Sequence, residues 1–312
     1  MNCSLTDSLT VCRLCPRGCG VDRAARPGYC KAGPDIKIAR AALHHWEEPC
    51  ISGRNGSGTV FFSHCTLGCV FCQNREISHS GKGRVVSAAR LAEIFLALQA
   101  QGAHNLNLVT PTHYAVGILD ALTLARQNGL SLPVVYNCGG YERPETIQML
   151  SPYIDVWLPD FKYAQQRLGL KYSAVSDYPE TALTAIAAML RHTGPPVLND
   201  DGLLRRGVLV RHLLLPGQLA DSMRAVTLLY DRFGDDILLS LMSQYTPPEH
   251  SDSDFAARYP ELTRRVNPRH YEALLDYAAG LGITRCYVQD SAAADSAFIP
   301  AFDLTGVNAA GG

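Results

Sequence analysis

The sequence predicts an α/β protein whose core is a partial barrel of parallel strands, each followed by a helix. Three observations support this fold class. After residue 58, apolar runs of strand length alternate with stretches whose apolar residues recur at helical spacing. The chain has 312 residues, which suits one large domain with a small appendage. Cysteines are concentrated near the N-terminus, where Cys12–Cys72 holds seven of the 11 if Cys50 is left aside.

The chain divides into three segments. We expect a cysteine-rich metal-binding segment over 1–52, a core domain over 53–290 and a C-terminal tail over 291–312. The first 50 residues are punctuated by Cys, Gly, Pro and Arg and show little periodicity, which predicts loops rather than a helix or strand. The tail ends in AFDLTGVNAAGG and is expected to be mobile at its end.

The core elements alternate in order along the chain. Ser87 is suited to cap the first helix, and Gly129 to end the second. Six or seven apolar strands, each followed by a helix, indicate parallel β/α units with both sheet faces covered. The predicted strands are 58–62, 105–109, 133–137, 154–161, 207–217, 236–242 and 284–290. The predicted helices are 87–102, 115–128, 143–150, 179–192, 219–233 and 268–281.

Composition and charge narrow the class of function. Apolar residues make up 47% of the chain, charged residues 18%, and the net charge is -1, so no bulk attraction to nucleic acid or anionic lipid is expected. No apolar stretch approaches the roughly 20 residues of a membrane span. The N-terminus lacks the charged-then-apolar order of a secretory signal. We therefore expect a cytoplasmic protein, in which clustered thiols are more often metal ligands or catalytic groups than disulfides.

The segment HCTLGCVFCQN places Cys65, Cys69 and Cys72 at C-x3-C-x2-C spacing, directly after the first predicted strand. Three thiolates on a tight loop can each hold one iron of a [4Fe–4S] cube and leave the fourth iron open to a small molecule. The alternative is a closed zinc site completed by His64 or Cys50. Placement after an apolar strand favours the cluster.

This spacing, with Phe71 before the last cysteine, resembles the radical S-adenosylmethionine (SAM) superfamily. The similarity covers most of residues 40–290 and is closest to uncharacterised homologues of pyruvate formate-lyase activating enzyme. It implies a partial (β/α)6 TIM-like barrel and a [4Fe–4S] cluster whose open iron binds SAM and, once reduced, cleaves it to a 5′-deoxyadenosyl radical. The blocks that carry it are FFSHCTLGCVFCQN, NLNLVTPTHY, VVYNCGGY, LPDFKY, VRHLLLPG and LMSQYTP.

Polar groups that follow the strands are the candidates for binding SAM. The resemblance implies that Asp160 and Lys162 contact SAM as an Asp-x-Lys pair, and that Asn137 stands where activating enzymes carry an aspartate. Those enzymes hold the SAM amino group with a Gly-Gly-Glu segment after the second strand, and this chain has no such segment there. The candidate cofactor-binding residues are Asn74, Thr110, Thr112, His113, Asn137, Asp160, Lys162 and Arg211.

Side-chain alternation along the strands indicates where some of these residues point, independently of the resemblance. Arg211 and His212 are neighbours on an otherwise apolar strand, so one of them faces the interior, where an unpaired charge is expensive. We expect Arg211 to bind the SAM carboxylate or the substrate. Asp160 and Lys162 lie two apart and point the same way, although a surface ion pair is the alternative. His113 could equally cap a helix or transfer a proton.

A second set of thiols lies in the N-terminal segment, at C-x2-C-x3-C-x10-C spacing. Four thiolates suit a closed zinc site or a second cluster, and both remain open, as do reduced thiols without metal. Neighbouring arginines and Lys31 would offset the charge of a tetrathiolate centre. A cluster here could relay electrons or anchor substrate, and zinc would fold the appendage. The four residues are Cys12, Cys15, Cys19 and Cys30.

The resemblance also implies partners. Flavodoxin or ferredoxin would supply one electron, and the radical would abstract hydrogen from a glycine of a glycyl radical enzyme. One alternative is radical modification of another peptide, a tRNA or a small molecule, and the balanced charge disfavours tRNA. Another is a non-catalytic metal-binding scaffold or metallochaperone, which would have no need of charged groups at the strand ends.

Overall fold

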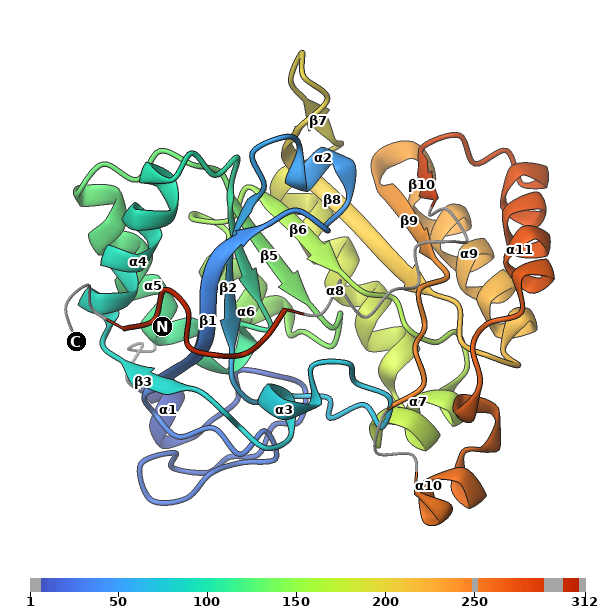
Figure 1. The fold of residues 1–312 in the computed structure, drawn as a ribbon, viewed down its shortest axis with the longest axis horizontal. Helices are drawn as coiled ribbons and strands as arrows, with labels where there is room; N and C mark the ends of the chain where they lie inside the picture. The colour runs from blue at the N-terminus through green and yellow to red at the C-terminus, as the bar shows by residue number, and fades with distance from the viewer. Residues whose placement is uncertain (1–6, 249–251, 289–299, 309–312) are drawn as a thin grey trace.

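The computed structural model describes residues 7–248, 252–288 and 300–308. Its ten strands form one open sheet in the order β10-β9-β8-β6-β5-β4-β2-β1-β3, with β7 paired to β8 (Figure 1). The seven strands from β2 to β10 along this order are parallel, whereas β1 and β3 join the edge in antiparallel register. The strands are β1 (Ile36–His44), β2 (Ser57–Phe62), β3 (Arg84–Val86), β4 (Leu106–Val109), β5 (Val134–Cys138), β6 (Val156–Pro159), β7 (Val197–Leu198), β8 (Leu204–Leu213), β9 (Leu238–Met242) and β10 (Cys286–Val288).

Helices connect the parallel strands and cover the outer face of the sheet, with α4 and α5 at one end and α9 and α11 at the other (Figure 1). The helices are α1 (Asp7–Thr10), α2 (Pro49–Ser52), α3 (Arg75–Ser78), α4 (Ala88–Ala100), α5 (Ala115–Gln127), α6 (Pro144–Leu150), α7 (Gln166–Ser173), α8 (Tyr178–Thr193), α9 (Leu219–Phe233), α10 (Ser253–Arg258) and α11 (Pro268–Gly280). Three short 3₁₀ helices are η1 (Thr112–Tyr114), η2 (Gly234–Asp236) and η3 (Pro260–Thr263).

Every predicted core strand and helix is present in this part of the chain. Ser87 caps α4 by accepting a hydrogen bond from the Arg90 backbone N–H. The last predicted strand, 284–290, is observed as β10, and its residues 289–290 lie outside the described residues. The seven parallel strands do not close on themselves, so the barrel is partial, as the sequence predicts.

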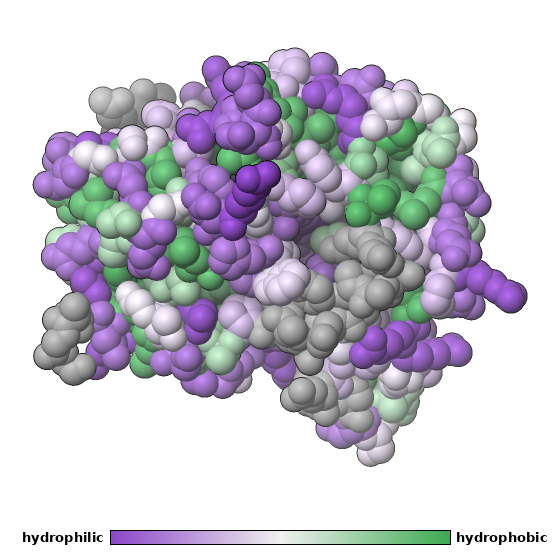
Figure 2. Space-filling view, turned by 45° about the horizontal axis from the view of Figure 1, so that its top comes forward, coloured by the Kyte–Doolittle hydropathy of each residue, from purple (hydrophilic) through white to green (hydrophobic). Residues whose placement is uncertain are grey.

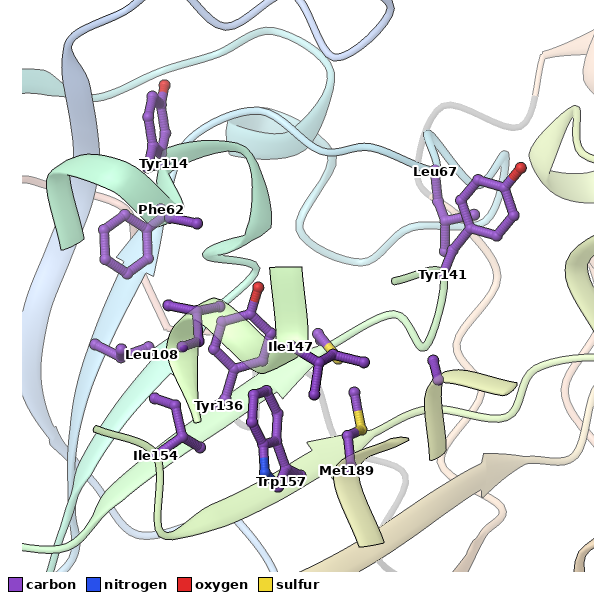
Figure 3. Packing of buried hydrophobic residues seen from close by; sticks show 14 of the residues in the cluster. Phe62, Leu67, Leu108, Tyr114, Tyr136, Tyr141, Ile147, Ile154, Trp157 and Met189 are labelled. Carbon is purple, nitrogen blue, oxygen red and sulfur yellow. The ribbon is translucent and has the colours of Figure 1, made fainter. Parts of the chain in front are cut away.

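Alternation along the strands separates an apolar outer face from a mixed inner face. Tyr136 of β5 and Trp157 of β6 point toward the helices, where their ring centroids lie 5.1 Å apart and Met189 of α8 lies beside them (Figure 3). The next residues along β5 and β6, Asn137 and Leu158, therefore point to the inner face. The candidate site lies on this inner face of the sheet.

Three N-terminal elements, α1, β1 and α2, correct the prediction that the first 50 residues form only loops. Ile36 and Ile38 alternate with charged residues and are buried in β1, which pairs with β2. The alternation was too short to stand out because Ala39, Ala41 and Ala42 follow it. The third element, α2, begins with Pro49 at its first turn and packs buried side chains against the inner strands.

The described part of the predicted tail is fastened to β1. The Ala41 N–H donates to the Thr305 carbonyl at 2.9 Å, and the Leu304 N–H donates to the Ala39 carbonyl at 3.1 Å. Arg40 pairs with Asp303 at 2.9 Å. The end of the tail, where mobility was expected, lies outside the described residues.

The molecular surface is mixed in polarity. Hydrophilic side chains predominate on the face in Figure 2, and hydrophobic ones occur there in small groups. Among the helices of the described residues, we find none that is both long and apolar enough to cross a membrane.

Candidate functional site

A cavity of about 260 Å³ lies at the carboxyl ends of the parallel strands. It brings together residues that are far apart in sequence, including Cys65, Cys69 and Cys72. It is also lined by seven of the eight candidate cofactor residues, namely Asn74, Thr110, Thr112, Asn137, Asp160, Lys162 and Arg211. The eighth, His113, does not line this cavity.

The three cysteines of the loop between β2 and α3 are free thiols that each accept a hydrogen bond. The Leu67 N–H donates to the Cys65 sulfur at 3.4 Å. The Ser173 hydroxyl donates to Cys69 at 3.0 Å, and the Ser78 hydroxyl donates to Cys72 at 3.3 Å. Such donors stabilise thiolate and tune an attached metal centre.

Without a metal the thiols of Cys65 and Cys72 favour the protonated state. Burial raises the pKa of the Cys65 thiol to about 12 and also raises the pKa of Cys72, in each case with help from the neighbouring thiols. A metal must therefore displace protons when it binds. Three free thiols with sulfur-directed donors, on one rim of a cavity, form a donor set that fits an iron–sulfur cluster with an open iron.

Arg211 is the centre of a buried charge network on the inner face of the sheet. Its Nε donates to Asp160 at 2.9 Å and its Nη1 to Glu47 at 3.2 Å. Its Nη2 donates to the Asn137 side-chain carbonyl at 2.6 Å. Lys162 completes the network by pairing with Asp160 at 2.6 Å. Each nitrogen of the guanidinium group thus has a partner within the protein.

The network keeps its central carboxylate ionised. Burial opposes the charge on Asp160, but Arg211 and Lys162 outweigh it and hold the pKa of Asp160 below its usual range. Burial likewise opposes the charge on Lys162, and Asp160 more than offsets this, so the pKa of Lys162 is raised. The cavity therefore presents a fixed anion and two fixed cations near the cysteines.

Glu47 is the functional residue that sequence reasoning missed. It lies in the connection between β1 and α2 and lines the cavity. Besides Arg211 it contacts two amides, accepting from Asn107 at 3.0 Å and from Asn137 at 3.3 Å. Burial raises the pKa of Glu47, and Arg211 and Asn107 oppose this rise. The available signal was the pair Glu47-Glu48 directly before Pro49, since adjacent acidic residues before a buried turn need partners.

The segment after β4 turns its residues toward two different places. Thr110 lines the cavity with a φ of 59°, a left-handed conformation that is rare and strained for a β-branched residue. The Thr112 hydroxyl donates to the buried Glu142 at 2.7 Å. His113 points away, and its Nε2 contacts the Ser63 carbonyl at 2.7 Å. His113 therefore lies apart from the residues of the larger cavity, because neighbours in a 3₁₀ helix diverge.

His113 instead lines a second, smaller cavity together with the four N-terminal cysteines. The two sets of thiols are therefore separate in space. Within the described residues, no three His, Cys, Asp or Glu side chains form a group that could hold a single metal ion. Of the remaining cysteines, Cys138 lines the larger cavity and Cys286 lies half-buried in β10.

Comparison with known proteins supports the fold. No protein-family model matches the chain. An uncharacterised protein from Methanocaldococcus jannaschii is 26% identical over 287 residues, which cover 88% of this chain and 76% of that protein. The structure of Streptococcus suis SuiB bound to S-adenosylmethionine matches with a TM-score of 0.50 and 13% identity, over 72% of this chain and 48% of SuiB.

A second structure of SuiB matches with the same TM-score, 12% identity and 75% of this chain covered. The chain spans about half the length of SuiB. A domain of pyruvate-formate lyase-activating enzyme from Bacteroides vulgatus has a TM-score of 0.40, too low to show a shared fold. The likeness to SuiB confirms the predicted fold class: the chain has a partial barrel of parallel strands, each followed by a helix.

Proposed function

We propose that this protein is a radical SAM enzyme. The observation that carries the proposal is the cavity, where Cys65, Cys69 and Cys72 share one lining with Asp160 and Lys162. A [4Fe–4S] cluster on these thiols, when reduced by one electron, supplies the cleavage of SAM to a 5′-deoxyadenosyl radical. A scaffold that only stores metal has no need of a buried anion and two buried cations beside its thiols.

Different residues around the cavity would bind different groups of SAM. SAM carries a carboxylate, an amino group and a sulfonium, so it needs both signs of charge nearby. Lys162 offers N–H groups beyond the one that pairs with Asp160. Gly139 also lines the cavity and packs against Leu67, which a Cβ at this position would meet at 2.6 Å. Arg211 would hold the Asp160 carboxylate in place through their hydrogen bond.

Anaerobic reconstitution tests the proposal. The chain is loaded with iron and sulfide, reduced and given SAM, and 5′-deoxyadenosine is measured. We expect the product from the unaltered chain and none from Cys65→Ala. Cys286→Ala is the matched control, because this thiol lies outside both cysteine sets, and it should retain the activity. An unaltered chain that binds zinc on the three cysteines and forms no 5′-deoxyadenosine would overturn the proposal.

We further propose that the radical acts on a glycine of a glycyl radical enzyme, and that flavodoxin or ferredoxin delivers the electron in the cytoplasm. The sequence blocks that resemble activating enzymes support this assignment. Trp46, which is 58% exposed, lies on the cavity lining, and an exposed indole is a common anchor for a protein partner.

Docking can be tested separately from cleavage. Trp46→Ala should weaken binding of a glycyl radical enzyme and lower the yield of its glycyl radical, measured by electron paramagnetic resonance. SAM cleavage without the partner should stay unchanged. Leu170→Ala removes a comparably exposed apolar side chain that does not line the cavity, and it should leave the yield intact. A full yield from the Trp46 variant would remove this residue as an anchor.

A further inference from the structure

The four N-terminal cysteines converge although they are spread from Cys12 to Cys30 in sequence. They line one small cavity with Arg23 and Gly28. A Cβ on Gly28 would meet the Cys19 sulfur at 3.0 Å, so the backbone packs directly against this thiol. The converging thiols are Cys12, Cys15, Cys19 and Cys30.

Tight turns aim these thiols inward. The Gly18 N–H donates to the Cys15 carbonyl at 3.0 Å, and the Gly20 N–H donates to the Cys12 carbonyl at 2.9 Å. The Gly18 φ of 52° is available to glycine at little cost. These turns form without regular secondary structure, so a bound centre would give the segment the stability that a small apolar core cannot.

Backbone N–H groups point at the sulfur atoms. The Tyr29 N–H donates to the Cys19 sulfur at 3.3 Å. The backbone N–H groups of Arg17 and Ala32 favour the thiolates of Cys15 and Cys30, although burial raises the pKa of both thiols. Donors of this kind stabilise coordinated thiolate, and they are the same device that the loop of Cys65 uses.

We propose that the N-terminal cysteines hold a second iron–sulfur cluster, a [4Fe–4S] cube with a thiolate on every iron. A zinc ion would need all four thiolates in one closed shell around a single ion. A cube spreads four thiolates over four irons and accepts wider spacing. Arg23, buried at the same cavity, brings a positive charge toward this anionic centre.

The second centre lies directly against the loop that carries the first. Arg17, between Cys15 and Cys19, donates to the carbonyls of Thr66 at 3.0 Å and Leu67 at 3.2 Å. The Tyr29 hydroxyl also donates to Leu67, at 3.3 Å. The N-terminal cluster would therefore hold the catalytic loop in place, and this consequence rests on the proposed function.

Iron counting separates the two centres. After anaerobic reconstitution the unaltered chain should bind about eight irons, and Cys12→Ala/Cys15→Ala should bind about four. Cys65→Ala/Cys69→Ala/Cys72→Ala should also bind about four, and their reduced cluster should give a paramagnetic resonance signal that SAM does not alter. Cys286→Ala is the control and should keep the full iron content.

Two results would overturn the second cluster. One is a zinc ion that is present in the unaltered chain and lost from Cys12→Ala/Cys15→Ala. The other is a triple variant of the catalytic loop that binds no iron, and this variant leaves the N-terminal segment intact. Failure of the proposed function would look different, because the triple variant would then keep the iron content of the unaltered chain.

Discussion

Replacing Arg211 with methionine tests the central claim about the cavity, that its charges are held by mutual pairing. Methionine keeps much of the apolar volume of the arginine side chain but removes the three nitrogen atoms that donate hydrogen bonds to the network. Asp160 and Glu47 then lose the cation at 2.9 and 3.2 Å, and Lys162 remains near only the first of them. Breaking a buried ion pair by removing one partner costs about 3–5 kcal/mol. We expect Arg211→Met to lose about that much free energy of unfolding at pH 7.

The pH dependence of this loss has a definite sign. In the unaltered chain the pKa of Asp160 is depressed, so its stabilisation is complete above the unfolded value of about 3.9 and changes little between pH 5 and 7. In Arg211→Met the pKa of Asp160 should rise above its unfolded value, and the pKa of Glu47, which burial already raises, should rise further. Each such carboxyl destabilises more as pH rises, so the variant should recover stability on going from pH 7 to pH 5.

Urea unfolding followed by circular dichroism at the two pH values measures both effects. Arg205→Met is the matched control, because Arg205 lies on the same strand with its side chain exposed. A surface change of this kind should stay within about 0.5 kcal/mol. A loss below about 1 kcal/mol for Arg211→Met, or an equal loss at both pH values, would show that the charges are not buried and coupled as described.

Three further predictions concern other parts of the structure. Burial raises the pKa of Glu142 to about 8, so the stability that comes from its neutral form is present below pH 4.5 and is lost as pH rises through 8. Over this range the free energy of unfolding should fall by up to about 1.4 kcal/mol per pH unit, and Glu142→Gln should abolish this fall in unfolding titrations. Gly140 and Gly129 both have positive φ, so replacing either with alanine should lower the free energy of unfolding by about 1–2 kcal/mol. Gly140→Ala should lose more than Gly129→Ala, because its Cβ would lie 2.1 Å from a backbone oxygen, whereas a Cβ at Gly129 meets nothing within 4 Å. Arg17→Ala should lower the iron bound by the catalytic loop and cost about 2 kcal/mol, while the exposed Arg26→Ala should change neither iron content nor melting temperature.

The core could be predicted because its strands are buried on both faces. Runs such as 134–136 and 237–239 are apolar throughout, and this pattern does not depend on distant partners. The strand β1 was missed for the opposite reason. Its order depends on pairing with β2 on one side and with β3 and the tail segment 300–308 on the other, and none of these contacts leaves a mark on the local sequence.

The candidate site, too, could be predicted from the sequence only in part. Arg211 could be assigned to the inner face because strand alternation leaves only two choices, and the structure sends His212 to the outer side, where its Nδ1 contacts the Phe161 carbonyl at 2.6 Å. Alternation gives no such guidance in loops. Glu47 enters the cavity through the turn that leads into α2, and Thr112 and His113 diverge within η1. Such placements depend on how the connections pack.

The network also refines what each cation in the cavity can do. Arg211 was expected to bind a carboxylate of SAM or substrate, but all three of its nitrogens already donate to the protein, to Asp160, Glu47 and Asn137. Moving it toward a ligand would leave two buried carboxylates unpaired, at a cost larger than one new ion pair returns. Lys162 has a single protein partner and donors to spare. A ligand carboxylate in this cavity should therefore meet Lys162, and Arg211 should serve it by keeping Asp160 charged and fixed.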